Sequence, residues 1–260
     1  MTEDLSSLSE MKDFVTSLAR GLTVIQAFDK ENGRLTLTDV AKRTSLSRAT
    51  ARRFLFTLHA LGYVESDNKL FWLSPKILEL GYSYLASQPI VDTVQPFIER
   101  VSHETGESCS VSVLDGFDVV YIARFLTHHI MSVTLNVGTR LPAFVTSMGR
   151  VLLASKSDQE IDEILKNTQL KKYTEFTLID RDQIKDSLKQ VHTDGYSIVC
   201  QELELGLRSV AVPIRNSRGQ IVAAINVGTQ AARISEEELI ETILPSLQKA
   251  ARDIQDILPS

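Results

Sequence analysis

The 260-residue sequence predicts an α+β protein with a small helical N-terminal part and a larger mixed C-terminal part. Two observations lead to this fold class. In residues 14–75, apolar side chains recur with helical spacing and then form two short strand-like runs. In residues 91–260, strand-like and helix-like segments alternate, with about six strands, which is typical of an α+β domain. Residues 1–13 are then a polar tail, and residues 76–90 a linking helix.

The N-terminal part has the element order of a winged helix-turn-helix. Residues 14–28 carry apolar side chains every three or four positions, which predicts the first helix. We expect Thr38 to cap a short second helix and Ser47 to cap a third, which Gly62 ends. Two short apolar runs around a polar turn within residues 63–73 predict a hairpin.

The C-terminal part shows one strong hairpin signal and two helix starts. Asp115-Gly116 separates two alternating apolar runs, as in a tight β-turn. Ser157 with Glu160, and Ser235 with Glu238, have the spacing of a capping box. Helices are expected at 92–104, 147–155, after 157, at 180–193 and after 235, and strands at 108–114, 119–125, 131–137, 196–201, 209–214 and 220–227.

Charge divides along the chain as these elements do. The net charge is −5, but residues 14–76 carry +5 and residues 77–260 carry −7. A basic N-terminal part followed by an acidic C-terminal part is typical of a two-domain DNA-binding protein, although chance clustering can produce a similar difference.

The composition indicates a cytoplasmic protein. No stretch approaches the roughly 18 apolar residues that span a bilayer, and the acidic N-terminus does not resemble a signal peptide. Cys109 and Cys200 fit no metal-ligand spacing or disulfide framework, although a bridge between the two stays open.

Several motifs carry a family resemblance over most of residues 14–257. These are LTDVA at 37–41, SRATARRFL at 47–55, GTRLP at 138–142, SMGRVLLA at 147–154 and GLRSVAVP at 206–213. The chain thereby resembles the IclR family of bacterial transcription regulators. Residues 110–116 and 146–150 are similar to the subgroup that controls aromatic-acid catabolism through the β-ketoadipate route. One departure is Arg150, where many relatives carry lysine.

The resemblance implies a GAF-like C-terminal sensor domain, no catalysis and no cofactor. It also implies a homodimer, or a dimer of dimers, on a palindromic DNA operator and away from membranes. The effector would be an aromatic acid such as protocatechuate or 4-hydroxybenzoate, with a different small carboxylate as the alternative.

The third helix carries most of the residues expected to contact DNA. Arginine forks match guanine acceptors, so Arg48 is expected to read bases while Arg52 and Arg53 hold phosphates. Taken alone, this helix equally fits a solvated cationic face. The full expected set is Thr38, Ser45, Ser47, Arg48, Thr50, Arg52, Arg53 and Lys69.

The expected effector pocket combines a fixed cation with hydroxyl groups at a helix start. Arg124 and Arg140 both lie beside apolar strands, and either could instead form a structural ion pair. Ser147 is expected to cap the helix that follows it, and Thr146 or Ser147 to select ring substituents. The full expected set is Arg124, Arg140, Thr146, Ser147, Met148, Gly149, Cys200, Glu202, Ser209 and Asn226, of which Cys200, Glu202 and Asn226 come from the resemblance.

Other functions have weaker support from the sequence. Adjacent residues point in opposite directions on a strand, so His128 and His129 are poor partners for one metal ion. Glu202 and Glu204 could form an acid–base pair, but solvated or structural carboxylates explain them better. An enzyme therefore lacks a nucleophile–base or metal constellation. A DNA-binding scaffold would leave a domain of sensor size unexplained.

Overall fold

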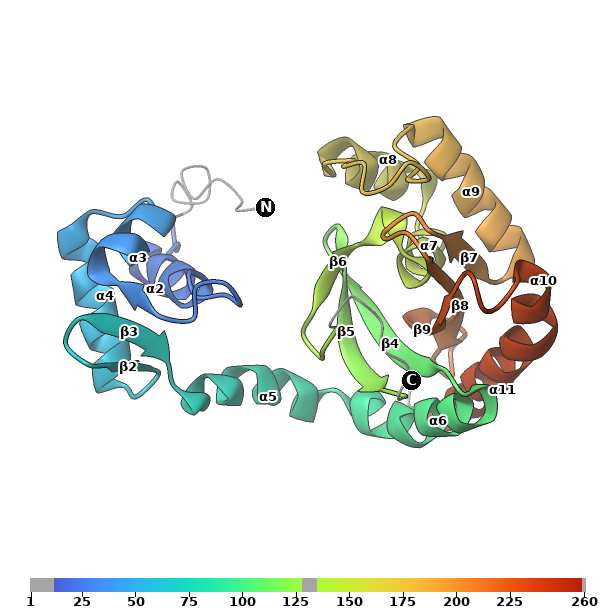
Figure 1. Cartoon of the computed structure of the whole chain (residues 1–260), viewed down its shortest axis with the longest axis horizontal. Helices are drawn as coiled ribbons and strands as arrows, with labels where there is room; N and C mark the ends of the chain where they lie inside the picture. The colour runs from blue at the N-terminus through green and yellow to red at the C-terminus, as the bar shows by residue number, and fades with distance from the viewer. Residues whose placement is uncertain (1–11, 128–134, 259–260) are drawn as a thin grey trace. The chain divides into compact units, whose positions relative to one another are not determined.

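The computed structural model describes residues 12–127 and 135–258 (Figure 1). Contacts divide the chain into two compact units, Met1–Tyr84 and Leu85–Ser260. Each unit has its own apolar core. Among the described residues, no helix combines the length and the apolar character that crossing a membrane requires.

The N-terminal unit is a helical bundle with a small antiparallel sheet in the order β1-β3-β2. Its buried core includes Val24, Val40, Ala51 and Leu55, which come from the apolar faces of the three helices. The elements are α2 (Thr16–Gln26), β1 (Leu35–Thr36), α3 (Leu37–Arg43), α4 (Arg48–Ala60), β2 (Val64–Ser66) and β3 (Leu70–Leu73). This confirms the winged helix-turn-helix order, to which the structure adds the two-residue strand β1, too short to leave a periodic pattern.

The cap predicted for α3 is wrong by two residues. Thr36 caps the helix: its Oγ1 accepts a hydrogen bond from the Asp39 backbone N–H at 3.2 Å, and the Asp39 carboxylate accepts from the Thr36 backbone N–H at 3.1 Å. Asp39 stands at the third helical position only if the helix starts at residue 37, and this reciprocal pair fixes the start. Thr38 is instead exposed in the first turn.

The turn between α3 and α4 fixes where the third helix begins. Ser45 takes a left-handed conformation with φ of +54°, which reverses the chain after α3. Ser47 then caps α4, as predicted, because its hydroxyl accepts a hydrogen bond from the Thr50 backbone N–H. The start of α4 is therefore set by two serines of the turn, Ser45 and Ser47, which lie two positions apart.

The C-terminal unit is built on a six-stranded antiparallel sheet in the order β6-β5-β4-β9-β8-β7. α6 and α11 pack on one face, and α7, α8 and α9 contribute to the apolar core on the other (Figure 1). The elements are α6 (Pro89–Thr105), β4 (Ser108–Asp115), β5 (Asp118–Phe125), β6 (Arg140–Pro142), η2 (Ala143–Val145), α7 (Ser147–Leu153), α8 (Asp158–Asn167), α9 (Arg181–Asp194), β7 (Ser197–Cys200), β8 (Leu207–Arg215), β9 (Ile221–Gln230), α10 (Glu236–Glu238), η3 (Leu239–Ile243) and α11 (Leu244–Gln255). In the sequence, η1 (Pro75–Ile77) follows β3 within the first unit, and α5 (Leu78–Ser87) contains the boundary between the two units.

The sheet departs from the sequence prediction at one edge. The strand expected at 131–137 lies partly outside the described residues, and residues 135–137 are not in a strand. The edge strand is β6, which pairs with β5 through contacts such as Val119 with Leu141. A three-residue edge strand is too short for an alternating pattern to reveal it.

Candidate functional site

Strand β4 gives the sheet one polar and one apolar face. Its serines at 108, 110 and 112 alternate with Cys109 and Val111, which are buried in the core beneath α6 and α11. The register places Ser110 between Arg124 of β5 and Asn226 of β9. Three strands therefore contribute polar side chains to the same face of the sheet.

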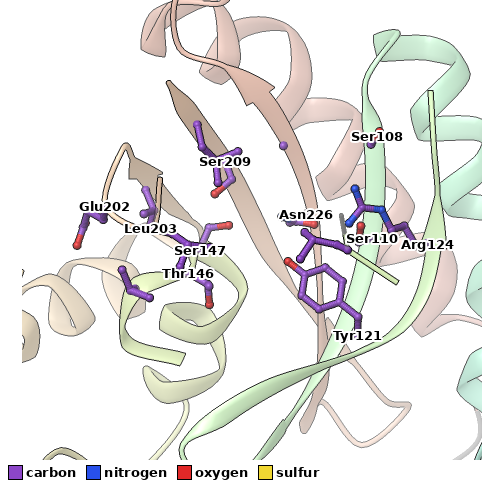
Figure 2. A pocket seen from close by; sticks show the side chains of 15 residues that line it. Ser108, Ser110, Tyr121, Arg124, Thr146, Ser147, Glu202, Leu203, Ser209 and Asn226 are labelled. Atoms are coloured by element: carbon purple, nitrogen blue, oxygen red, sulfur yellow. The ribbon is translucent and has the colours of Figure 1, made fainter. Parts of the chain in front are cut away.

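A pocket lies between this polar face and the start of α7 (Figure 2). Its empty volume is about 610 Å³, including the part that opens to solvent. Its polar lining is Ser108, Ser110, Tyr121, Arg124, Thr146, Ser147, Glu202, Ser209 and Asn226. Its apolar lining is Leu135, Val145, Val199, Leu203 and Leu207. A pocket with apolar walls and a few convergent polar groups is typical of a small-molecule site.

Arg124 is the cation of this pocket. Its guanidinium Nε and Nη1 atoms are buried and have no hydrogen-bond partner in the described structure. Burial lowers the pKa of Arg124, an effect that the nearby Tyr121 opposes, and burial likewise raises the pKa of Tyr121 to about 12. An anion bound beside Arg124 would supply the missing acceptors.

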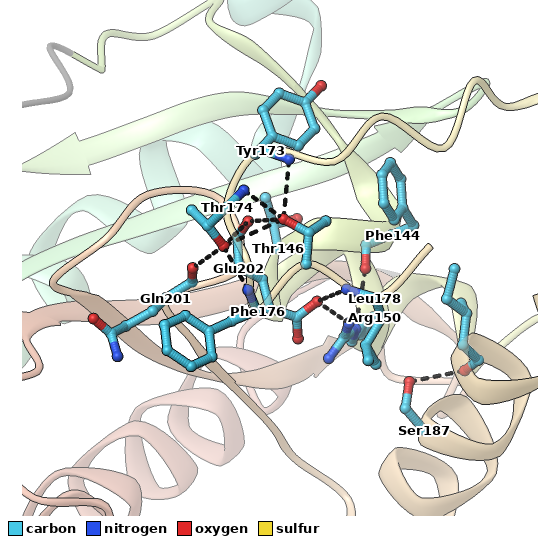
Figure 3. A network of polar contacts seen from close by, with 12 residues as sticks. Phe144, Thr146, Arg150, Tyr173, Thr174, Phe176, Leu178, Ser187, Gln201 and Glu202 are labelled. Atoms are coloured by element: carbon cyan, nitrogen blue, oxygen red, sulfur yellow. Dashed lines mark hydrogen bonds and ion pairs between the residues drawn. The ribbon is translucent and has the colours of Figure 1, made fainter. Parts of the chain in front are cut away.

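The carboxylate in the pocket lining is neutralised by an ion pair. Glu202 Oε2 lies 2.7 Å from Nη2 of Arg150, and both side chains are less than a tenth exposed. The same oxygen accepts a hydrogen bond from the Leu178 backbone N–H at 3.1 Å, while Arg150 Nε donates to the Phe144 carbonyl at 3.0 Å (Figure 3). The charge of Glu202 is thus balanced, whereas Arg124 has no counter-ion among the described lining residues.

Two threonines of the loop before α9 hold this wall in place. Thr174 Oγ1 donates to the Gln201 carbonyl and Thr177 Oγ1 donates to the Glu202 carbonyl, each at 2.6 Å (Figure 3). Gln201 itself has a positive φ of +57°. The segment with Glu202 and Leu203, which line the pocket, is therefore held in two ways. The Glu202 side chain pairs with Arg150, and the backbone carbonyls of Gln201 and Glu202 accept hydrogen bonds from the two threonines.

The start of α7 differs from the prediction in its cap. Thr146, not Ser147, caps the helix: its Oγ1 accepts from the Gly149 backbone N–H at 3.1 Å and contacts the Ala143 carbonyl at 3.3 Å. Thr146 has the extended backbone that a cap needs, whereas Ser147 is already the first helical residue. The Ser147 hydroxyl is buried, lines the pocket and has no hydrogen-bond partner among the described residues.

Four of the expected pocket residues do not line the pocket. The Arg140 side chain is nearly half exposed and forms ion pairs with Asp115 and Asp118 at the tip of the hairpin. Met148 is buried in the core, where its sulfur accepts a hydrogen bond from Ser112, and Gly149 packs so tightly that a Cβ would lie 2.0 Å from the Ala143 carbonyl oxygen. Cys200 is also absent from the lining.

The other six expected residues line the pocket, together with residues that the sequence analysis did not predict. Arg124, Thr146, Ser147, Glu202, Ser209 and Asn226 all line the pocket. Sequence reasoning missed Ser108, Ser110 and Tyr121. The signal was available, because serine at every second position of a strand marks a polar face within an otherwise apolar sheet.

The N-terminal unit presents a second candidate site around α4. Thr38, Arg48, Arg52 and Lys69 are exposed and line one groove between α3, α4 and the β2–β3 hairpin. The Arg52 guanidinium lies over the Phe56 ring, 4.6 Å from its centroid. This groove carries three cations, which suits a polyanion.

Other expected DNA-contacting residues lie beside this groove. Ser45, Ser47 and Arg53 are exposed, and Thr50 is half-buried. The hydroxyl groups of Ser47 and Thr50 are 2.8 Å apart, so each already has a partner at the start of α4. The cations are therefore the groups in this set most available to a ligand.

The remaining polar candidates form no metal site among the described residues. No cluster of three His, Cys, Asp or Glu side chains occurs in residues 12–127 and 135–258. His128 and His129 lie outside these residues. Cys109 and Cys200 are both free thiols, so the structure has no bridge between them.

Comparisons with known proteins agree with this architecture. The IclR helix-turn-helix domain matches residues 17–68, and the bacterial transcriptional regulator IclR C-terminal domain matches residues 82–256. The Pca regulon regulatory protein of Pseudomonas putida is 46% identical over 243 residues, which cover 93% of this chain and 84% of that protein.

Two solved structures are similar over nearly the whole chain. A candidate transcriptional regulator from Rhodococcus sp. RHA1 has 52% identity and a TM-score of 0.83, covering 94% of this chain and 98% of its own. An IclR homolog from Microbacterium hydrocarbonoxydans, complexed with 4-hydroxybenzoate, has 25% identity and a TM-score of 0.79, covering 92% and 98%. With both domains matched in order and the fold shared, the chain belongs to the IclR family of bacterial transcription regulators, and it is a regulator rather than an enzyme.

Proposed function

We propose that this regulator senses a small aromatic carboxylate in the pocket beside Arg124 and controls genes of aromatic-acid catabolism. The observation that carries the proposal is the Arg124 guanidinium, two of whose nitrogen atoms are buried without a hydrogen-bond partner in the described part of the chain. Leaving such donors unsatisfied in a low-dielectric site is costly, so a carboxylate that accepts from them gains affinity. Because Arg150 already pairs with Glu202, the pocket lining keeps a net positive charge.

The rest of the lining suits an aromatic ring. Val145, Val199, Leu203 and Leu207 offer apolar contact to a flat ring, and Leu135 adds to them. The Microbacterium homolog holds 4-hydroxybenzoate, and the Pseudomonas relative is a Pca regulon regulator. Both relatives support an aromatic acid over other small carboxylates.

The DNA-binding role is proposed for the exposed cations of α4 and the hairpin. Arg48 stands at the start of α4, where recognition helices read base edges, and we assign it to bases. We assign Arg52, Arg53 and Lys69 to phosphates, because each is exposed and cationic. Thr38, Ser45, Ser47 and Thr50 would add neutral contacts. We further propose a symmetric oligomer on a palindromic operator, since two-fold protein symmetry matches paired half-sites.

Titration calorimetry on the full chain tests the ligand assignment. We expect 4-hydroxybenzoate and protocatechuate to bind and the neutral 4-hydroxybenzamide to bind far more weakly. Replacing Arg124→Met should weaken binding of the acids roughly 10- to 100-fold, the range expected for losing a charge-assisted hydrogen bond. Arg140→Gln is the matched control, because that arginine pairs with Asp115 and Asp118 away from the pocket.

Two results would contradict the assignment. Equal binding of the acid and its amide would show that the pocket does not recognise the carboxylate. Unchanged affinity of Arg124→Met for the acids would show that Arg124 does not bind the carboxylate. Thermal unfolding gives an independent measurement, since a ligand at 100 times its Kd stabilises the fold by about 2.7 kcal/mol.

A further inference from the structure

We infer that the Ser147 hydroxyl selects effectors that carry a second polar group on the ring, opposite the carboxylate. The inference rests on the proposed function, because it assumes a carboxylate beside Arg124. It assigns to Ser147 a recognition role that is separate from helix capping. The pocket would then distinguish hydroxybenzoates from benzoate itself.

Unpartnered polar atoms in the described structure point to this residue. Five described side chains have a buried nitrogen or oxygen without a hydrogen-bond partner: Arg100, Arg124, Ser147, Ser197 and Arg208. Of these, only Arg124 and Ser147 line the pocket. Ser147 is 1% exposed, so bulk water cannot serve as its partner in the way it does for a surface serine.

The neighbouring hydroxyl is already occupied. Thr146 Oγ1 accepts from the Gly149 backbone N–H and contacts the Ala143 carbonyl, so the helix cap uses it. Ser147 follows Thr146 in the chain and enters the same pocket, but its hydroxyl remains available. The substituent-selecting role therefore falls to Ser147 rather than to Thr146.

The two available groups lie on opposite walls. Arg124 belongs to β5 of the sheet, whereas Ser147 opens α7 across the pocket (Figure 2). A ring between them presents a different edge to each wall. A carboxylate at one edge accepts from Arg124, and a ring hydroxyl at the other can donate to Ser147 Oγ or accept from it. Benzoate would satisfy Arg124 and leave Ser147 without a partner.

Calorimetry with two ligands and two alanine variants tests this role. We expect the wild-type chain to bind 4-hydroxybenzoate about tenfold more tightly than benzoate, or better. Ser147→Ala should bring this ratio close to one, mainly by weakening 4-hydroxybenzoate. Ser197→Ala is the matched control, because Ser197 is also buried and unpartnered but does not line the pocket, and it should keep the wild-type ratio.

The outcomes separate this inference from the proposed function. If neither acid binds the wild type, the proposed function is wrong and the inference falls with it. If both acids bind equally to the wild type, or Ser147→Ala keeps the preference, the Ser147 role alone is wrong. Should Ser147→Ala not fold, Ser147→Cys keeps a side chain of similar shape with a much weaker hydrogen-bonding group, and it should reduce the same ratio.

Discussion

Three arginines of α4 and two arginines of the C-terminal unit, Arg124 and Arg150, lie in opposite surroundings. In α4, the side chains of Arg48, Arg52 and Arg53 are exposed. In the C-terminal unit, Arg150 is almost fully buried against Glu202, and Arg124 has two buried nitrogen atoms for which the described residues offer no partner. The difference shows that solvent exposure, more than residue type, determines whether an arginine contacts DNA, forms a structural ion pair or binds a small ligand.

Solvent exposure determines how strongly and how selectively each arginine side chain interacts with an anion. An exposed guanidinium is well hydrated, so it contributes little to folding and serves to attract and position a polyanion. A buried guanidinium has lost much of its hydration. If it has an ion-pair partner within the protein, it contributes to the fold, and if it has none, it can bind an anionic ligand. Arg150 has that partner in Glu202, whereas two nitrogen atoms of Arg124 have none within residues 12–127 and 135–258.

The largest expected effect is on stability and concerns Arg150. Arg150→Met should lower the free energy of unfolding by about 3–5 kcal/mol, because it leaves the Glu202 charge buried and unpaired. Urea unfolding measures this. Adding Glu202→Leu in the same chain should restore part of the loss, since no buried charge then remains. Arg140→Gln, at an exposed ion pair, should change stability by less than about 1 kcal/mol. Equal losses of unfolding free energy in Arg150→Met and Arg140→Gln would contradict the proposed difference between buried and exposed arginines.

The arginines of α4 should affect DNA binding and leave folding unchanged. Arg48→Ala should cost about 1–3 kcal/mol on the preferred sequence if it grips a guanine. Arg53→Ala should weaken every sequence similarly and reduce the salt dependence by about one phosphate contact. Fluorescence anisotropy over a salt series, with a selected operator and a scrambled duplex, separates the two. Unchanged binding after both replacements would exclude this helix from the DNA interface.

The smallest expected effect tests what sets the helix-turn-helix start. Thr36→Ala should destabilise the N-terminal unit by about 1 kcal/mol, while Thr38→Ala should stay within about 0.5 kcal/mol. The hydrogen bonds from Thr36 also lower the pKa of Asp39 from its ordinary value of 3.8. This contribution is therefore present above that value and is lost as the pH falls through the lowered pKa. Thermal unfolding of both variants between pH 7 and about pH 3 should show that only Thr36→Ala reduces this dependence. Equal stability of the two variants would contradict the assignment of the cap to Thr36, and a larger loss in Thr38→Ala would assign it to Thr38.

Much of the fold could be predicted because its signals are local. Helical and strand periodicity, the cap at Ser47, the turn at Asp115-Gly116 and the capping box at Ser157 each depend on residues a few positions apart. Apart from the strand expected at 131–137, these signals agree with the structure. The family resemblance then pointed to the regulator class, which the comparisons bear out. The same local logic misjudged the cap of α3, where two threonines two positions apart were both plausible.

The pocket was decided by contacts between residues far apart in the sequence. Arg124 and Arg140 each lie near an end of a strand. Only the sheet register brings Asp115 and Asp118 to Arg140, while no described carboxylate forms an ion pair with Arg124. Arg150 and Glu202 are 52 positions apart, so their pairing has no local pattern. Sequence by itself determined most helices and the longer strands, but not the short strands β1 and β6, and it determined which residue types are available. Tertiary structure alone decided which charges neutralise one another, because burial and partner distance depend on how separate elements pack.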